Sequence, residues 1–133
     1  MNTDKHRSEM EDKINQITER IIGAAFAVSN TLGAGFLEKV YENAMMVECS
    51  KIGLDAKQQQ PIQVFYHDNV VGEYFADLFV ENQIVVEFKA VKAIDDVHLA
   101  QLLNYLKACK LRYSLLINFG KPKVEIKRVV NGF

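Results

Sequence analysis

One segment, ADLFVENQIVVEFKA, constrains the fold of this 133-residue chain more than any other, because it fits a β-hairpin in a single register. A polar triplet at residues 81–83 interrupts an apolar run, which is typical of a tight turn between two antiparallel strands. A turn at that triplet places Val80 opposite Ile84. The same register places Asp77 directly opposite Glu87. The sequence therefore predicts two acidic side chains next to each other on one face of a hairpin.

The two faces of this hairpin differ in polarity. Lys89 follows Glu87 by two residues, and because side chains alternate along a strand it projects from the same face as Asp77 and Glu87. The other face is expected to be wholly apolar, with the pairs Val80–Ile84, Leu78–Val86 and Ala76–Phe88. A shift of register by one residue would scatter the charged side chains over both faces. The segregation of polarity therefore selects this register and gathers Asp77, Glu87 and Lys89 in one patch.

This patch has the composition of a divalent-metal site. Mg²⁺ is commonly held by one or two carboxylates, with water and phosphate oxygens as its other ligands. Asp77 and Glu87 could supply the carboxylates, and the Lys89 ammonium could activate or orient water and stabilise charge developing on a phosphate. The bare pattern also fits a surface hairpin with a cross-strand Lys–Glu pair. Against that second interpretation, like charges placed opposite each other among apolar neighbours are destabilising unless a cation or a raised pKa relieves them.

Size and composition indicate one globular domain. Residues 1–13 are polar and are expected to be partly helical, and residues 14–133 are expected to form the single domain. The longest apolar run, residues 21–28, is too short for a membrane span, which takes about 20 residues. Cys49 and Cys109 have no metal-type spacing and are expected to be buried thiols. We therefore expect a cytoplasmic protein that does not contact membranes.

The net charge of −1 is unevenly distributed along the chain. From Lys89 onward, nine Lys and Arg residues oppose three Asp and Glu residues, a net charge of +6, which leaves −7 for the preceding part. This balance excludes a simple polycation that coats nucleic acid. The asymmetry fits either two solvated faces of one domain or a basic surface beside an acidic cleft, as a phosphodiester substrate would require.

The hydrophobic periodicity changes from helical to alternating near Pro61. Two helices, three strands, one helix and two strands are expected in that order, at residues 9–31, 36–51, 60–66, 70–80, 84–89, 96–109, 113–119 and 124–130. Gly33 and Gly35 are expected to form the turn between the first two helices. A helix that links two strands makes them parallel neighbours in such a unit. The chain is therefore expected to be a mixed α/β protein of order ααβββαββ, with a sheet of four to five strands flanked by helices.

Two helices carry further candidate site residues. On the third helix, Gln101 and Tyr105 are spaced i, i+4 and face the same way, with His98 one turn earlier. They are either an ordinary polar edge or side chains that reach the site. On the second helix, Glu38 and Glu42 are spaced i, i+4 and form one exposed acidic face by default. The alternative is that Glu38, near the start of this helix, provides a carboxylate for a second metal ion. The apolar side of this second helix is expected to comprise Leu37, Val40, Tyr41, Ala44 and Val47.

Several motifs occur in the order found in a known family. GFLEKVY, residues 35–41, matches the GxxExxY signature of a family of small prokaryotic proteins, and DLFVENQIVVEFKAV, AQLLNYLKA and LLINFG resemble its later blocks. The similarity extends over residues 14–130. The chain thus resembles the GxxExxY family of the PD-(D/E)xK nuclease-like superfamily. The resemblance implies a restriction-endonuclease-like core with a mixed sheet between helices.

The resemblance also implies a role for each acidic and basic candidate. Asp77 and Glu87 match the metal-binding acidic pair, and Lys89 matches the catalytic lysine. Glu38 matches the acidic residue of the preceding helix, which makes it a third candidate for catalysis and metal binding. Ala76 departs from the superfamily pattern, which has Pro before the Asp, but this position supplies no ligand.

The third helix matches the family as well. Gln101 and Tyr105 match a Gln-x-x-x-Tyr element of the RecB-like branch, which implies that they position the substrate. His98 matches no motif position.

These features predict a Mg²⁺- or Mn²⁺-dependent nuclease, or a nuclease-like protein, that hydrolyses DNA phosphodiester bonds, with DNA favoured over RNA. The intact lysine favours catalysis, because an inactive descendant would be expected to have lost the lysine or a carboxylate. The alternative is a non-catalytic nucleic-acid- or protein-binding regulatory module that retains the fold, which the near-neutral net charge favours. A homodimer formed through exposed parts of the first helix is an assembly that would enlarge the surface for specificity.

Overall fold

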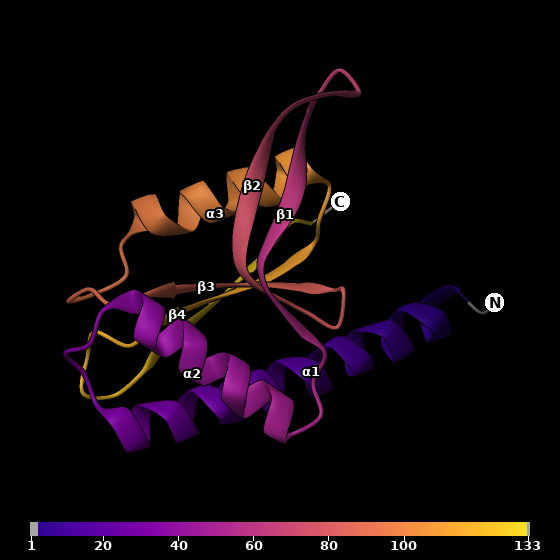
Figure 1. The fold of residues 1–133 in the computed structure, drawn as a ribbon. Coiled ribbons are helices and arrows are strands. Elements are labelled where there is room, and N and C mark those ends of the chain that lie inside the picture. Colours follow the sequence, from indigo (N-terminus) through magenta and orange to yellow (C-terminus); the bar gives the residue numbers. More distant parts are fainter. Residues whose placement is uncertain (1–2, 133) are drawn as a thin grey trace.

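The computed structural model describes residues 3–132, which form a mixed sheet with helices on both sides (Figure 1). The elements are α1 (Thr3–Leu32), α2 (Glu38–Lys51), β1 (Ala56–Tyr66), β2 (Asn69–Val80), β3 (Ile84–Lys89), α3 (Asp96–Cys109), β4 (Tyr113–Asn118) and β5 (Glu125–Val130). This order, two helices, three strands, a helix and two strands, is the predicted one. The expected mixed α/β class is therefore confirmed.

The five strands form one sheet in the order β1-β2-β3-β4-β5. β3 and β4 are parallel, and all other neighbouring strands are antiparallel. A parallel pair needs a crossover connection, which α3 provides. The predicted β-α-β unit is confirmed, and it places the end of β3 close to α3 across the face of the sheet.

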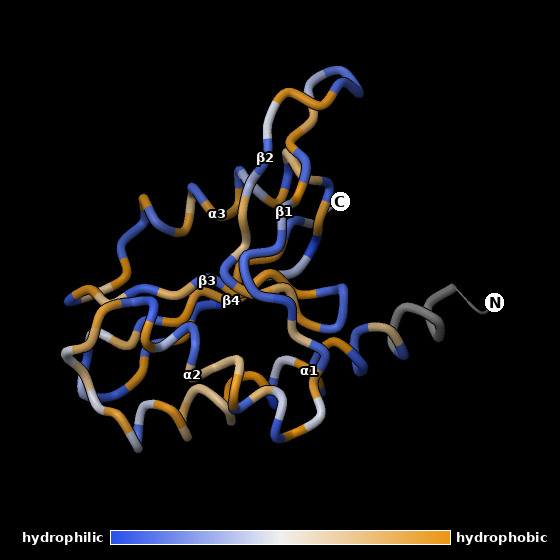
Figure 2. The backbone as a smooth tube through the Cα atoms, in the orientation of Figure 1, coloured by the Kyte–Doolittle hydropathy of each residue, from blue (hydrophilic) through white to orange (hydrophobic). Residues whose placement is uncertain are grey.

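The sheet separates two hydrophobic cores. On one face, α1 and α2 pack against inward side chains of β2, β3 and β4, among them Leu78, Val86 and Ile117. On the other face, α3 contributes Leu102 and Leu106 to a smaller core. Figure 2 shows hydrophobic residues along the central strands, which lie between α3 on one side and α1 and α2 on the other. The helices α1 and α2 therefore anchor one face, while α3 closes over the other.

Some elements begin at other residues than predicted. The first helix starts at Thr3 rather than at residue 9. No apolar periodicity precedes Ile14, but Lys, Arg, Glu and Met are good helix formers and extend the helix toward the N-terminus. Residues 1 and 2 of the polar segment lie outside the described residues. The first strand starts at Ala56, four residues before the expected start.

The predicted apolar side of α2 is confirmed for Tyr41 and Ala44 but wrong for Leu37, Val40 and Val47. Leu37 is 81% exposed and Val47 is 62% exposed, whereas α2 buries Tyr41, Glu42, Met45 and Cys49. Apolar residues occur on nearly every side of this helix, so their spacing does not determine which side faces the core. Because α2 packs in this rotation, the acidic side chain of Glu42 is buried.

The turn between α1 and α2 requires glycine, as predicted. Gly33 and Gly35 have φ angles of 72° and 114°, in the region that favours glycine. The buried Tyr41 hydroxyl donates to the Gly33 carbonyl at 2.6 Å and accepts from the Phe36 N–H at 3.2 Å. Its ring stacks on Phe119 at 4.6 Å. Tyr41 therefore fixes the turn that leads into α2.

A buried amide fixes the chain just after β3. Asn118 accepts from the N–H of Val91 at 3.0 Å and donates to its carbonyl at 2.9 Å. The same side chain accepts from the N–H of Gly120 and donates to Glu125. Gly120 packs so closely on this segment that an added Cβ would lie 2.2 Å from the Val91 oxygen. These contacts hold the end of β3, where Lys89 lies.

Two expectations from composition concern membranes and thiols. Within residues 3–132, no helix is both long and apolar enough to cross a membrane. Cys49 and Cys109 are free and buried, as expected. Burial raises the pKa of the Cys49 thiol to about 11, which keeps it in the unreactive protonated form at neutral pH.

Candidate active site

The predicted hairpin register is confirmed where β2 and β3 pair. The pairs are Leu78–Val86, Phe79–Val85 and Val80–Ile84. Beyond Leu78 the ladder is replaced by bonds that involve side chains. The N–H of Phe88 donates to Asp77 Oδ2 at 2.9 Å, and the N–H of Asp77 donates to Glu87 Oε1 at 3.3 Å. Asp77 and Glu87, called the carboxylate pair below, are thus held together at the point where the two strands separate.

The strands separate because β2 is kinked at Asp77. Leu78 packs in the core under α1 and α2, whereas Ala76 packs in the core under α3. A regular strand would put both on one face. Opposite Asp77 the β1–β2 pairing skips Gln59, which has a φ of 51°. The predicted pairing of Ala76 with Phe88 is therefore wrong, and the outer part of the β1–β2 hairpin bends away from the sheet (Figure 1).

The ionised form of Glu87 is disfavoured, as expected for two carboxylates placed next to each other. Burial first, and then the negative charge of Asp77, raises the pKa of Glu87 to about 8. The Tyr74 hydroxyl donates a hydrogen bond to Glu87 Oε1, which opposes part of this increase. Burial and the charge of Glu87 in turn raise the pKa of Tyr74. A proton or a cation is favoured at this position, as expected for two close carboxylates in a desolvated site.

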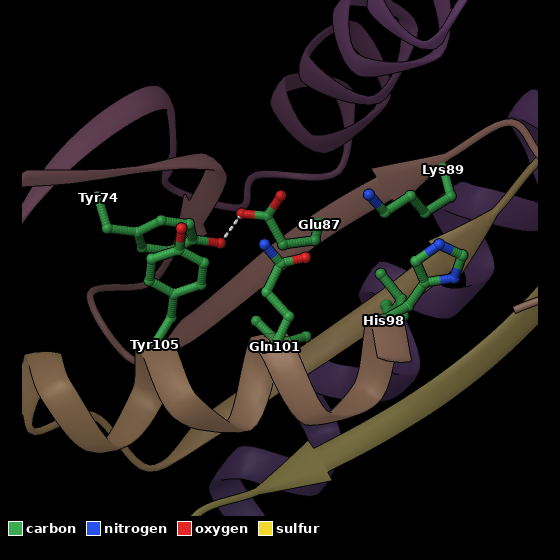
Figure 3. A pocket seen from close by; sticks show the side chains of 8 residues that line it. Tyr74, Glu87, Lys89, His98, Gln101 and Tyr105 are labelled. Atoms are coloured by element: carbon green, nitrogen blue, oxygen red, sulfur yellow. Dashed lines mark hydrogen bonds between the residues drawn. The ribbon is translucent and has the colours of Figure 1, made fainter. Parts of the chain in front are cut away.

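A pocket of about 190 Å³ opens between β3 and α3 (Figure 3). It is lined by Tyr74, Glu87, Lys89, His98, Gln101, Leu102, Tyr105 and Leu116. Figure 3 shows Glu87 and Lys89 projecting from β3 toward Gln101 and His98 of α3. No hydrogen bond or ion pair of the Lys89 ammonium occurs among residues 3–132, so its charge is available to a ligand. The structure thus brings together Glu87, Lys89, Gln101 and His98.

The start of α3 orients His98. Asp95 caps the helix by accepting from two backbone N–H groups, and its own N–H donates to His98 Nδ1 at 3.2 Å. A ring nitrogen that accepts a hydrogen bond carries no proton, so the neutral imidazole has its proton on Nε2. His98, which no motif identified, therefore lies in the pocket wall with a defined tautomer.

Tyr74 is a site residue that the sequence did not indicate. Strict alternation puts Tyr74 on the same face as Leu78, away from the carboxylate pair. The kink at Asp77 turns Tyr74 to the α3 face, where its ring stacks on Tyr105 at 4.0 Å. The kink is accompanied by the positive φ of Gln59 on the neighbouring strand, and no sequence pattern predicts it.

The two acidic residues of α2 are placed differently from each other. Glu38 is exposed in the first turn, and no contact with the carboxylate pair is found for it among the described residues. Glu42, expected by default on an exposed acidic face, is only 4% exposed. Its carboxylate accepts from Lys39 at 2.8 Å and from Gln59 at 3.0 Å. Glu42 precedes Met45 and Cys49 at helical spacing, a signal that it lies on the buried side.

The donor set suits a cation that prefers oxygen. Asp77 and Glu87 offer two carboxylates, and Mg²⁺ or Mn²⁺ commonly binds such a pair together with water and substrate oxygens. Within residues 3–132, no group of three or more His, Cys, Asp and Glu side chains is close enough to hold a metal ion, so a closed zinc site is not formed there. The residues present therefore fit a divalent ion held by two protein carboxylates.

Comparisons with known proteins identify the superfamily and a similar fold. A family model described as the PD-(D/E)XK nuclease superfamily matches residues 15–129. The fold is similar to that in a solved structure titled "Crystal structure of SSO0001", with a TM-score of 0.53 and 15% sequence identity. That alignment covers 96% of this chain but only 63% of the other one, so this chain spans less than two thirds of its length. No curated protein matches the chain.

Proposed function

The chain belongs to the PD-(D/E)XK nuclease superfamily, and from this premise we propose that it is a Mg²⁺- or Mn²⁺-dependent nuclease that hydrolyses DNA phosphodiester bonds. We assign it to the GxxExxY branch of the superfamily on the basis of Gly35, Glu38 and Tyr41. The structural role of Tyr41 in the turn before α2 supports this assignment, because it gives the signature a physical purpose.

The observation that carries the proposal is a pair of carboxylates with a raised pKa at Glu87, beside a lysine whose ammonium has no hydrogen bond or ion pair among the described residues. Burial first, and the nearby charge of Asp77 second, raise the pKa of Glu87 to about 8, so the folded chain holds this carboxyl group in a place that disfavours its ionised form. Structural stability alone gives no reason to keep the two carboxylates together. Perturbed groups of this kind cluster at functional sites. Lys89 lines the same pocket as Glu87, as catalysis at a phosphate requires.

The carboxylate pair would hold the divalent ion. When bound, the ion would supply Lewis-acid stabilisation of the phosphate and promote ionisation of the attacking water. Glu38, exposed on the first turn of α2, is the candidate for an additional carboxylate. The ion would also relieve the repulsion within the pair, so ion binding and folding would stabilise each other.

The other pocket residues would act on the substrate directly. The Lys89 ammonium would orient the attacking water and stabilise the negative charge that builds up on the phosphate. Gln101 lies on the exposed side of α3 next to the pocket, where its amide can donate to a phosphate oxygen. The ring of Tyr105, stacked on Tyr74, would pack beside the substrate. The net positive charge of the chain from Lys89 onward favours approach of a polyanion.

Incubation with linear and circular DNA and RNA in the presence of Mg²⁺ or Mn²⁺ tests this function. Lys89→Ala should reduce cleavage by about 100-fold or more, the scale reported for loss of one charge-stabilising group. Lys92→Ala is the matched control, because Lys92 is exposed and does not line the pocket. Equal inactivity of the wild type and the Lys89 variant on every substrate, with both proteins folded, would refute the enzyme and favour the binding module.

A further inference from the structure

The polar contacts of the carboxylate pair extend to α2 through one glutamine. Gln59 donates from a single amide nitrogen to Asp77 Oδ1 at 3.2 Å and to Glu42 Oε1 at 3.0 Å. The amide group has two N–H donors, which matches two carboxylate acceptors. Gln59 is therefore a bridge between the buried acidic residue of α2 and the acidic residue at the kink of β2.

The far end of this bridge is firmly held. Glu42 is 4% exposed, and its second oxygen accepts from the Lys39 ammonium at 2.8 Å and from the Gln58 amide. A buried carboxylate needs such donors, because leaving it without partners is costly. Glu42 is thus a fixed point against which the amide of Gln59 is oriented.

The near end of the bridge limits the rotation of Asp77. The N–H of Phe88 on β3 holds Oδ2 at 2.9 Å, and Gln59 on β1 holds Oδ1. Donors from the strands on either side of β2 therefore determine the plane of this carboxylate. A carboxylate that ligates a metal depends on such outer partners, and their loss typically weakens metal binding by about 10- to 100-fold.

We propose that Gln59, anchored by Glu42, is a positioning residue that orients the Asp77 carboxylate for divalent-cation binding. This inference rests on the proposed function only in that the ligand is a cation at the carboxylate pair. It gives the buried Glu42 a role beside Asp77 that sequence reasoning considered only for Glu38. It also explains why a glutamine occupies a backbone position with a φ of 51°, which most residues adopt at a cost.

The backbone conformation must be separated from the bridge in any test. Gln59→Asn does so, because Asn tolerates a positive φ while its amide is one methylene too short to reach both carboxylates. Gln58→Ala is the matched control. The Gln58 amide donates to Glu42 and Asn43, and no hydrogen bond joins it to Asp77 among the described residues, so its loss disturbs the anchor region without removing the bridge.

Calorimetric titration with Mn²⁺, without nucleic acid, measures the effect on binding. We expect Gln59→Asn to weaken Mn²⁺ binding by about 10-fold or more, and Gln58→Ala to change it by less than about 3-fold. Equal affinities for the two variants would overturn the proposal.

Crystal structures of the metal-free variants distinguish this proposal from the nuclease function. The Asp77 carboxylate should be rotated relative to the wild type in Gln59→Asn and unchanged in Gln58→Ala. An unmoved Asp77 in Gln59→Asn would overturn the positioning role. A rotated Asp77 in a protein whose wild type binds no Mn²⁺ would uphold the positioning contact and refute the metal site itself.

Discussion

Replacing Glu87 with glutamine should stabilise the metal-free protein at neutral and alkaline pH. Burial and the charge of Asp77 raise the pKa of Glu87 to about 8 in the folded protein, against an ordinary value of 4.5. The glutamine carbonyl can still accept from the Tyr74 hydroxyl and the Asp77 N–H, but glutamine does not ionise. The variant should therefore keep the contacts of the protonated acid and lose only the cost of its ionisation.

The sign and size of the effect follow from proton linkage. Between about pH 4.5 and about pH 8, folded Glu87 keeps a proton that the unfolded chain has released, so the free energy of unfolding falls as the pH rises. This contribution is fully present below the lower pH and is lost by the upper one. Because a tenfold change in proton affinity is worth about 1.4 kcal/mol, the whole loss is about 5 kcal/mol, with about 3 kcal/mol lost by about pH 7.

Urea denaturation of wild type and Glu87→Gln in the presence of a chelator, across this pH range, measures the effect. Titration of groups that do not interact with Glu87 is common to both proteins, so the difference in unfolding free energy reports on the Glu87 site alone. That difference should change by about 3 kcal/mol in favour of the variant between about pH 4.5 and about pH 7. A difference in unfolding free energy that stays constant with pH would refute the raised pKa of Glu87.

Four further substitutions have defined outcomes. Tyr74→Phe removes a hydrogen bond that lowers the pKa of Glu87, so the midpoint of the pH-dependent stability loss should move to higher pH; an unchanged midpoint would contradict this. Gly120→Ala should destabilise the protein in denaturation by about 1–3 kcal/mol, because its Cβ would lie 2.2 Å from a backbone oxygen. Gly23→Ala, in open space within α1, should instead stabilise it by about 0.5–1 kcal/mol, and similar values for the two variants would rule out the close packing. Tyr41→Phe loses two hydrogen bonds in the turn before α2 and should lower the unfolding free energy by about 1 kcal/mol; no change would deny the hydroxyl that structural role.

The fold and the β2–β3 register are predictable from the sequence for a physical reason. One face of this hairpin is buried, so a one-residue slip would bury the charged side chains, and only one register avoids that. The hydrophobic periodicity likewise identifies the crossover helix α3 between two strands. These features depend on local patterns with strong energetic consequences, and the structure reproduces them.

The kink at Asp77 is not predictable in the same way. Strict alternation assigns Ala76 and Tyr74 to the face of Leu78, whereas the structure turns both to the α3 side. The positive φ angle that accompanies the kink occurs at Gln59 on β1, opposite Asp77. Glutamine has no strong preference for positive φ, and no glycine lies at the kink. Tyr74 is missed as a site residue for this reason alone.

The placement of Glu38 and Glu42 shows a second limit of the sequence. A helix with apolar residues on several sides can pack in more than one rotation, and only tertiary contacts select one. The donors on β1, Gln58 and Gln59, compensate the buried charge of Glu42 and so make this rotation acceptable. That compensation joins residues 16 and 17 positions apart, which no local pattern reports.

Diffraction from crystals soaked in Mn²⁺ tests the central claim most directly, because the anomalous signal of the ion locates it without reference to activity. We predict one Mn²⁺ peak in contact with the carboxylates of both Asp77 and Glu87, at the Glu87 end of the pocket that Lys89 also lines. The peak should be lost in Glu87→Gln crystals. A Mn²⁺ ion bound elsewhere, or no Mn²⁺ peak at either carboxylate in crystals soaked at saturating Mn²⁺, would contradict the account.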